Sequence, residues 1–362
     1  MNFIDFEKAF DSIDHHVLWK ILKHYGIPQK IISIIQQLYD GFSCQVIHDG
    51  NLTEPFTVTT GVRQDCILFP LFLMVIDWVS KTAYKEPKGI QWTLQTRLED
   101  LDFADDICML SHRYQDMQHQ ATSLEEIAKQ TGLLINPQKT KTMRINTTQT
   151  DKLTIRDTEV ENVEQFTYLG SIISTTGGTD EDIKARKRKA QQAFAMLKSV
   201  WRSTTLRIST KLRLFNSNIK YVLLYGSETW RETASSIKAL QVFLNRCLRT
   251  ILGVRWPDTI SNKELWRKTK QQPINLTIRS RRWKWIGHTL RKANNNITKQ
   301  ALEWNPQGKR KRGRPKNSWH RGVISELQAI NTTWGEAKRK AQNRTRWKET
   351  VAALCPPWDE VE

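Results

Sequence analysis

The chain has 362 residues, of which 39% are hydrophobic and 26% charged, and this describes a globular protein with room for two domains. Its five cysteines are scattered without a Cys-x-x-Cys pair, which excludes a disulfide framework or zinc finger and indicates a reducing compartment. The longest apolar run, residues 67–79, is interrupted by Pro70 and Asp77 and is too short to span a bilayer, so no membrane partner is expected.

The net charge of +19 is divided unevenly along the chain. Residues 1–178 hold 16 Lys and Arg against 23 Asp and Glu, a net charge of −7, whereas residues 179–362 hold 40 against 14, a net charge of +26. A strongly basic half predicts salt-sensitive binding to a polyanion. Because 11 of the 14 tryptophans follow residue 200, we expect that polyanion to be a nucleic acid; generic solubility is the alternative.

The first 175 residues alternate short strands with helices, which predicts the α+β class. A buried strand at residues 3–5 is followed by a helix at 15–25 that Gly26 stops and that restarts after Pro28. Further on we expect strands at 44–48 and 56–60 with a turn at Asp49-Gly50, a buried helix at 67–79, strands at 97–103 and 107–110, a helix at 114–131, and strands at 142–145 and 166–169.

The pattern changes at Gly177-Gly178, after which helices dominate. We expect one long basic helix over 180–202 and further helices at 208–224 and 235–252. From about residue 261 the chain is rich in tryptophan and basic residues, residues 308–317 are a stretch of Gly, Pro, Lys and Arg, and a last helix ends near Leu354.

Two adjacent acids, Asp105 and Asp106, occupy the predicted turn between the strands at 97–103 and 107–110. Adjacent carboxylates repel each other unless a cation lies over them. Asp5 ends the first predicted strand and completes a set of three acids. Such a set suits two Mg²⁺ ions, with Mn²⁺ as the alternative, that serve the attack of a hydroxyl on a phosphate. An isolated Asp-Asp pair would instead be a polar surface turn.

Five segments resemble, in order, the motifs A to E of one family. They are Asp5-Phe6-Glu7-Lys8-Ala9-Phe10-Asp11, Gly61-Val62-Arg63-Gln64-Asp65-Cys66, Phe103-Ala104-Asp105-Asp106, residues 132–141, and Phe166-Thr167-Tyr168-Leu169-Gly170-Ser171. Through them the chain resembles the reverse transcriptase of a non-LTR retrotransposon, the long interspersed element type. Residues 225–230, 282–288 and 312–315 extend the resemblance into the second half.

The resemblance implies a right-hand polymerase fold and its activity. Residues 1–175 would form a palm with an antiparallel sheet and packed helices, residues 176–260 a helical thumb, and residues 261–362 a basic, tryptophan-rich region that binds nucleic acid. The implied activity is RNA-directed DNA synthesis with two Mg²⁺ ions, on an RNA template with a DNA primer and deoxynucleoside triphosphates. The implied compartment is the nucleus, or the cytoplasm for an RNA-bound element protein, and no oligomeric state is implied.

The resemblance also assigns the catalytic roles. Asp5, Asp105 and Asp106 match the catalytic acids that hold the metal ions. Lys139 matches the lysine that donates a proton to the leaving pyrophosphate, and Lys141 is the alternative for that role.

Other residues match the nucleotide and primer sites. Phe10 matches the aromatic gate against a ribose 2′-OH, with core packing as the alternative. Arg63 and Gln64 match the motif B residues beside the incoming nucleotide. Asp11 is expected to cap the next helix. The primer grip is matched by Phe166, Tyr168 and Gly170.

Interleaved basic and aromatic residues in the last region suit stacking on bases beside phosphate contacts. We expect these contacts from Arg282, Trp283, Lys284 and Trp285. The segment 312–315 resembles the core of an AT-hook, in which Arg312 and Arg314 would enter the minor groove of A·T-rich DNA. A basic linker or a nuclear localisation run is the alternative.

The sequence departs from the family pattern in two places. It begins four residues before Asp5, so we expect a copy truncated before the fingers. Motif B carries Asp65 in place of glycine and Phe69 in place of serine, and the Asp65 carboxylate should repel a triphosphate. We therefore expect a decayed copy, and the alternative function is a non-catalytic remnant that binds nucleic acid. A metal nuclease with the same acids would not explain the order of the motifs.

Overall fold

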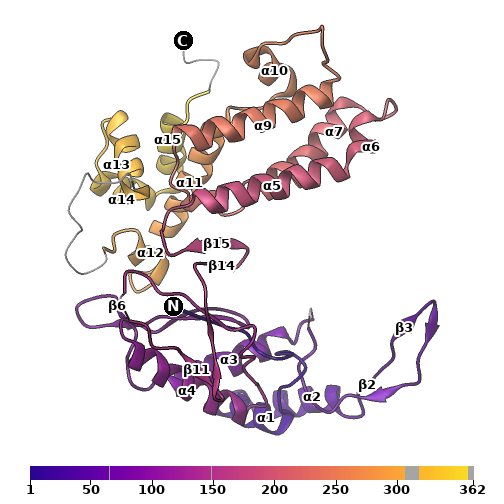
Figure 1. Ribbon diagram of the computed structural model, residues 1–362, viewed down its shortest axis with the longest axis vertical. Helices are drawn as coiled ribbons and strands as arrows, with labels where there is room; N and C mark the ends of the chain where they lie inside the picture. Colours follow the sequence, from indigo (N-terminus) through magenta and orange to yellow (C-terminus); the bar gives the residue numbers. More distant parts are fainter. Residues whose placement is uncertain (65, 148, 306–317, 358–362) are drawn as a thin grey trace. The chain divides into compact units, whose positions relative to one another are not determined.

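The computed structural model describes residues 1–64, 66–147, 149–305 and 318–357 (Figure 1). The chain divides into two units, Met1–Gly170 and Ser171–Glu362, and each has buried apolar clusters of its own. Of the residues singled out from the sequence, Asp65, Arg312 and Arg314 lie outside the described ranges.

The first unit is built on a five-stranded sheet with the strand order β13-β10-β1-β9-β8. At its centre lies β1 (Asn2–Ile4), which is buried along its length and pairs antiparallel with β9 (Asp106–Met109) and β10 (Lys141–Thr142). The outer pairs are antiparallel for β9 with β8 (Asp100–Phe103) and parallel for β10 with β13 (Glu161–Asn162). The sheet is therefore mixed, whereas the sequence predicted an antiparallel one.

The helices of this unit begin within two residues of their predicted starts. They are α1 (His15–His24), α2 (Gln29–Tyr39), α3 (Phe69–Ala83) and α4 (Tyr114–Gln130). The cap of α1 is Asp14, whose carboxylate accepts a hydrogen bond from the Val17 N–H at 2.9 Å. The prediction that Asp11 caps this helix is wrong, because a cap must immediately precede the first helical residue.

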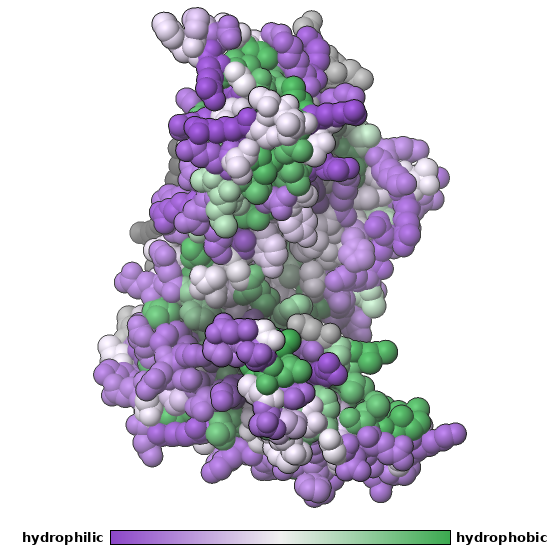
Figure 2. All heavy atoms as spheres, turned by 90° about the vertical axis from the view of Figure 1, so that its right-hand side faces the viewer, coloured by the Kyte–Doolittle hydropathy of each residue, from purple (hydrophilic) through white to green (hydrophobic). Residues whose placement is uncertain are grey.

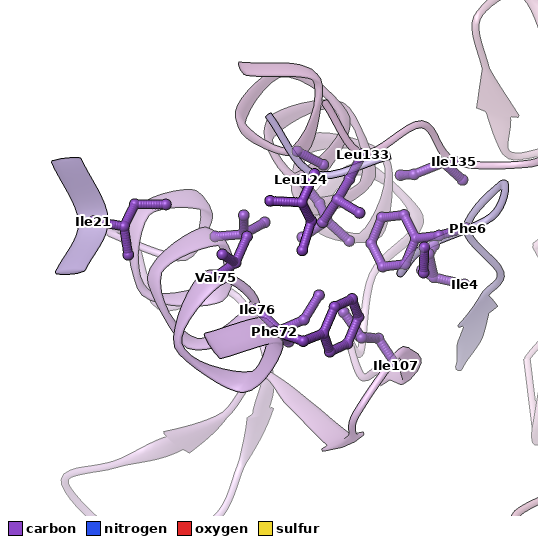
Figure 3. Close-up of a cluster of buried hydrophobic side chains, with 14 of the residues drawn as sticks. Ile4, Phe6, Ile21, Phe72, Val75, Ile76, Ile107, Leu124, Leu133 and Ile135 are labelled. Carbon is purple, nitrogen blue, oxygen red and sulfur yellow. The ribbon is translucent and has the colours of Figure 1, made fainter. Parts of the chain in front are cut away.

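The hydrophobic core of the first unit forms between the sheet and these helices (Figure 3). Ile4 and Ile107 extend from β1 and β9 toward Phe72 of α3, and all three are at most 4% exposed. Leu124 of α4 and Leu133, which follows that helix, close the core. Because the central strands supply core residues, the position at which each strand ends is firmly held.

Short hairpins complete the unit. The two-residue turn Asp49-Gly50 joins β3 (Ile47–His48) to β4 (Asn51–Leu52) with positive φ at both residues, as such a turn requires; the predicted turn is confirmed, but its second strand begins before residue 56. Figure 2 shows hydrophobic residues at the surface of one face, and Ile47 and Leu52 are among the exposed ones. The other short strands are β2 (Ser43–Cys44), β5 (Phe56–Thr57), β6 (Ile90–Gln91), β7 (Arg97–Leu98), β11 (Thr154–Ile155), β12 (Thr158–Glu159) and β14 (Gln165–Tyr168).

The second unit opens with β15 (Ser171–Ser174) and is otherwise mainly helical. The helix predicted over 180–202 is two helices, α5 (Asp180–Met196) and α6 (Lys198–Arg202). The helix predicted over 208–224 consists of α7 (Ile208–Leu214), a π-helical segment (Phe215–Lys220) and α8 (Tyr221–Leu223). The remaining helices are the 3₁₀ turn Ser227–Thr229, α9 (Ala234–Leu252), α10 (Asn262–Thr269), α11 (Ile274–Leu290), α12 (Ile297–Ala301), α13 (Trp319–Ala329), α14 (Trp334–Ala341) and α15 (Arg344–Leu354). Within the described ranges, no helix is both long and apolar enough to cross a membrane.

Two buried clusters stabilise the second unit, one formed by residues between Ile183 and Ile278 and one by residues between Trp283 and Leu354. The first cluster includes Leu265 and Ile274, so it continues past the predicted domain boundary at residue 260. The long helix α11 supplies residues to both clusters.

Residues 225–230, one of the segments that resemble the family, connect several helices of this unit. Trp230 is buried and its indole Nε1–H donates to Asp182 Oδ2 at 2.9 Å. Glu228 accepts from Arg281 Nε at 2.9 Å through its carboxylate and from Trp319 Nε1 at 2.8 Å through its backbone oxygen. The segment therefore ties α5, α11 and α13 together.

Candidate active site

Asp5 lies immediately after the central strand of the sheet. Its backbone is held on both sides by the segment that resembles motif D: the Asn136 N–H donates to the Asp5 carbonyl oxygen at 2.8 Å, and the Asp5 N–H donates to Thr140 Oγ1 at 3.3 Å. The Thr140 side chain is fully buried. No role was predicted for Asn136 or Thr140, which hold the backbone from which the Asp5 carboxylate extends.

Asp105 and Asp106 lie at the tip of the hairpin formed by β8 and β9, as predicted. Phe103 pairs with Asp106, so Ala104 and Asp105 form a two-residue turn, and Ala104 has a φ of 58°. The left-handed conformation is unusual for a residue with a side chain, and alanine adopts it here because the tight turn requires it.

The strand register brings Asp5 next to Asp106. Ile4 pairs with Ile107, so Asp5, which follows Ile4, and Asp106, which precedes Ile107, lie beside each other where the two antiparallel strands end. Burial raises the pKa of the Asp106 carboxyl, and the charges of Asp105 and Asp5 raise it further. The pKa of Asp5 is also raised, by burial and then by Asp105, against an opposing effect of Lys139. The three acids therefore form one electrostatic group.

Within the described ranges no set of three or more His, Cys, Asp or Glu side chains is arranged to hold a metal ion. That Asp5, Asp105 and Asp106 together hold metal ions therefore stays a prediction. The donor chemistry nevertheless fits a divalent cation, since carboxylate oxygens are the ligands that Mg²⁺ prefers and a cation would reverse the raised pKa values.

Lys139, and not Lys141, reaches the acids. Lys139 Nζ lies 3.8 Å from Asp5 Oδ1, and its side chain is 68% exposed. Lys141 Nζ instead forms an ion pair with Glu161 at 2.8 Å. The turn before Lys139 is held by Asn136, whose side-chain oxygen accepts from the N–H of Lys139 at 3.1 Å.

Phe10 packs partly into the core beside this group. Its ring stacks on Phe72 with centroids 4.1 Å apart and lies 5.7 Å from the ring of Phe69. The Val62 N–H donates to the Phe10 carbonyl oxygen at 2.6 Å, and Gly61 at φ 90° leaves less than 3 Å for a Cβ against the backbone of Asp11. Motifs A and B therefore pass each other too closely for any other residue at position 61.

The remaining motif B residues, Arg63 and Gln64, are exposed. Together with Tyr39, Phe42 and Phe56 they line a groove of about 600 Å³. The Arg63 N–H donates to the Tyr39 hydroxyl at 3.4 Å. Both predicted nucleotide-binding side chains are therefore accessible, in a groove that three aromatic residues and the segment 57–62 also line.

The predicted primer-grip residues hold β14 against the sheet. Phe166 stacks on Phe3 of β1 with centroids 4.1 Å apart. The Tyr168 hydroxyl donates to the backbone oxygens of Leu101 at 2.7 Å and Asp106 at 3.1 Å. Gly170 has a φ of 77° and turns the chain. Tyr168 therefore links this segment to the backbone of a candidate metal ligand.

Two of the residues predicted to contact nucleic acid are buried in the second unit. Trp283 is fully buried and its Nε1–H donates to Glu326 at 2.6 Å, while Arg282, 4% exposed, forms ion pairs with Glu232 and Glu326. The prediction that Trp283 stacks on bases and that Arg282 contacts phosphates is therefore wrong, because both side chains are buried inside the second unit. In the same segment Lys284 is exposed and Trp285 is half-buried against Trp319.

Comparison with known proteins agrees with this geometry. Residues 1–173 match the family described as reverse transcriptase (RNA-dependent DNA polymerase). The Pol polyprotein of the type-2 retrotransposable element R2DM of Drosophila melanogaster is 26% identical over 217 residues, covering 53% of this chain and 20% of that protein. That of a type-1 element R2 of Popillia japonica is 22% identical over 259 residues, covering 68% of this chain and 41% of that protein. Residues 1–173 are therefore a reverse transcriptase domain, similar to those of non-LTR retrotransposons.

The chain spans less than half of the length of these two R2 proteins. A transposon-derived protein of Caenorhabditis elegans is similar over 95% of its own length, with 26% identity across 70% of this chain. A second family, described only as a domain of unknown function, matches residues 193–225. Reverse transcriptases generally use divalent metal ions, and the chain's mixed helix and sheet architecture is that of an α+β protein.

Proposed function

We propose that this chain adds deoxynucleotides to the 3′-OH of a DNA primer on an RNA template. The observation that carries the proposal is the pairing of Ile4 with Ile107, which sets Asp5 beside Asp106 inside a segment that matches the reverse transcriptase family. The first unit would act as the palm and the helices from α5 onward as the thumb, followed by the basic C-terminal region.

Asp5, Asp105 and Asp106 would hold two Mg²⁺ ions, for which Mn²⁺ can substitute. The bound ions would favour the ionised form of the attacking hydroxyl and neutralise charge on the triphosphate. The carboxylates bind metal only when they are ionised. Because the pKa values of Asp5 and Asp106 are raised, metal affinity should fall as the pH is lowered through the acid range.

The neighbouring residues would position and protonate the reactants. Lys139, within 3.8 Å of Asp5, would donate a proton to the leaving pyrophosphate. The Phe10 ring, held against Phe72, would exclude a 2′-OH. Arg63 and Gln64 would contact the nucleotide, and β14 with Tyr168 would support the primer end.

Primer extension by the purified chain tests this function. On a primed RNA template with Mg²⁺, Asp5→Asn and Asp106→Asn should each abolish extension, whereas Asp151→Asn, at an exposed acid, should not. Extension that survives both substitutions would reject the mechanism. Binding of Mn²⁺, measured by calorimetry, should weaken in the same two variants and provides a readout independent of activity.

A non-catalytic remnant that binds nucleic acid remains the second candidate function, and the composition of motif B favours it. Phe69 replaces a serine and its ring lies against Phe10, and Asp65 adds a negative charge. We therefore expect slow extension by the unaltered chain and faster extension after Asp65→Gly with Phe69→Ser. A double variant that binds primed template but never extends it would identify the remnant.

We also propose the nucleus as the compartment of this protein, because a DNA primer and the +26 charge of the second half both suit a chromosomal target. Microscopy of the tagged full-length chain tests this, and exclusion from the nucleus would contradict it.

A further inference from the structure

A basic groove lies within the second unit. It is found at the end of α5, where α6 and α7 follow; Figure 1 labels these three helices. Its walls come from the last turn of α5, from α6, from α7 and from the end of α9, and it encloses about 960 Å³. We call it the α5–α9 groove. Most of its lining residues fall within residues 193–225, the segment that matches the domain of unknown function.

The charge of the α5–α9 groove is entirely positive. Lys198, Arg202, Lys211 and Arg255 line it, and no Asp or Glu is among its lining residues. Among the described residues, no carboxylate forms an ion pair with any of these four side chains. Several cations that converge without a counter-charge raise the local concentration of anions.

Lys211 is a buried basic residue in the wall of this groove. Its side chain is only 7% exposed, and its Nζ donates to the Trp201 backbone oxygen at 3.0 Å. An ammonium group has three donors, and burial of a cation without a paired anion is unfavourable. An anion in the groove would supply the missing charge and accept the remaining hydrogen bonds.

A tryptophan beside the groove adds a second kind of contact. Trp256 follows Arg255 and is 93% exposed, whereas Trp201 in the groove wall is buried against Phe194, with ring centroids 4.9 Å apart. Exposure of an entire indole ring to water is unfavourable. The flat, accessible ring next to a row of cations suits an unpaired base whose phosphates lie in the groove.

We propose that the α5–α9 groove binds single-stranded nucleic acid, with backbone phosphates on Arg202, Arg255 and Lys211 and a base stacked on Trp256. This goes beyond the proposed polymerase function and does not depend on it, because none of these residues belongs to the acid group of the first unit. It replaces the buried Arg282 and Trp283 as the contact site of the basic half.

Binding of the full-length chain to labelled 12-nucleotide RNA and DNA single strands tests the proposal. EDTA is present throughout, so that metal at the acids makes no contribution. Arg202→Ala with Arg255→Ala should lower the slope of log K against log salt by about 1.4, since each lost phosphate contact on a single strand contributes about 0.7. Trp256→Ala should weaken binding roughly 5- to 150-fold with the slope unchanged.

The matched control is Arg213→Ala with Arg344→Ala, which removes the same charge at two exposed arginines outside the groove. Circular dichroism confirms that every variant is folded. Comparison of RNA with DNA decides which strand is preferred, and a duplex of the same sequence should show no dependence on Trp256.

Three outcomes would overturn the proposal: equal losses in the groove pair and the control pair, no loss in Trp256→Ala, or tighter binding of polyglutamate or anionic vesicles than of single strands. The last outcome would make the groove a general anion site. Because catalysis is not measured, a failure here leaves the polymerase function untouched, and an inactive polymerase leaves this binding intact.

Discussion

Lys139 and Lys141 are two residues apart in the segment that resembles motif D, yet their side chains have different partners. In extended backbone, side chains two residues apart point to the same face, so this alternation alone would direct both lysines the same way. The separation comes from the turn that Asn136 initiates and from β13, whose Glu161 attracts Lys141. The lysine that can reach a leaving group beside Asp5 is therefore Lys139.

Lys139→Ala is expected to slow single-turnover extension by about 10²- to 10⁴-fold, the usual contribution of a positioned general acid. Lys141→Ala should change the rate only a few-fold, because an exposed ion pair contributes little. Rapid-quench measurements in the Asp65→Gly, Phe69→Ser background would supply sufficient signal. If Lys141→Ala slowed extension more than Lys139→Ala does, Lys141 would be the proton donor and Lys139 would not.

Asp100 of β8 is an acid that the fold keeps from water. Burial raises its pKa to about 7, and the charges of Asp102 and Glu99 contribute to the increase. Among the described residues, neither its Oδ2 nor the buried hydroxyl of Tyr84 has a hydrogen-bond partner. Burial, and then the charges of Asp100, Glu99 and Asp102, raise the pKa of Tyr84. The folded state therefore holds the Asp100 proton more tightly than the unfolded state does.

The pH dependence of stability follows from this raised pKa. The contribution of Asp100 is fully present below its ordinary pKa of 3.8 and is lost as the pH rises to about 7, an effect of at most about 4 kcal/mol. Asp100→Asn should remove this loss, so the variant should be the more stable protein at pH 8. Urea unfolding at pH 5 and pH 8 measures the difference, with Asp151→Asn as the control. A wild type that gains stability across this range relative to the variant would contradict the assignment.

At the scale of single elements, α11 has the interleaved basic and aromatic residues that predict nucleic-acid binding, yet two of these residues, Arg282 and Trp283, pack inside the protein. Gly287 allows Trp347 of α15 to approach so closely that a Cβ at residue 287 would lie 1.8 Å from Trp347 Nε1. That indole Nε1–H donates to the Trp283 backbone oxygen at 3.1 Å. The segment 282–288 is therefore a helix-packing motif.

Gly287→Ala should destabilise the protein by about 1–3 kcal/mol or more, because the Trp347 ring must move and lose its hydrogen bond. The control is Gly322→Ala in α13, where a Cβ would meet nothing within 4 Å. That change should stabilise the protein by up to about 1 kcal/mol through helix propensity. Thermal unfolding of both variants measures the contrast, and similar melting temperatures would refute the packing role.

The sequence predicted the elements around the acids well because local signals specify them. A short apolar run predicts β9, Gly and Pro mark where helices stop and restart, and the two adjacent acids mark a turn. The proximity of Asp5 and Asp106 could therefore be predicted from the pattern. Burial of Arg282 and Trp283 could not be predicted in this way. It depends on Glu232 and Glu326, which are 50 and 43 or more residues distant along the chain, and single-sequence patterns do not contain such pairings.

At the scale of the whole molecule, the two units differ in both charge and core. The apolar cluster of residues 4–160 lies wholly in the first unit, and the clusters of residues 183–278 and 283–354 lie wholly in the second. The negative charge lies with the acids and the positive charge with the α5–α9 groove. The acids that we propose to bind metal ions and the groove that we propose to bind nucleic acid thereby belong to different units.

Residues 171–362 are expected to fold when produced alone, since the apolar residues that stabilise them are all included. Circular dichroism should show a helical protein with a cooperative thermal transition. Residues 1–170 produced in the same way are the matched comparison. A fragment 171–362 that binds a hydrophobic dye and melts without cooperativity would show that the second unit needs the first.

The tryptophans of the second unit differ in their exposure, so their fluorescence can report on binding. Trp201, Trp230, Trp283 and Trp347 are at most 4% exposed, and their indole N–H groups are bonded inside the protein, whereas Trp256 is 93% exposed. A dissolved collisional quencher will therefore reach Trp256 far more readily than those four rings. Iodide, an anion that the neighbouring cations attract, should extinguish its emission more strongly than neutral acrylamide does. Binding of an unlabelled strand at Trp256 can thus be measured as protection of its fluorescence from iodide quenching.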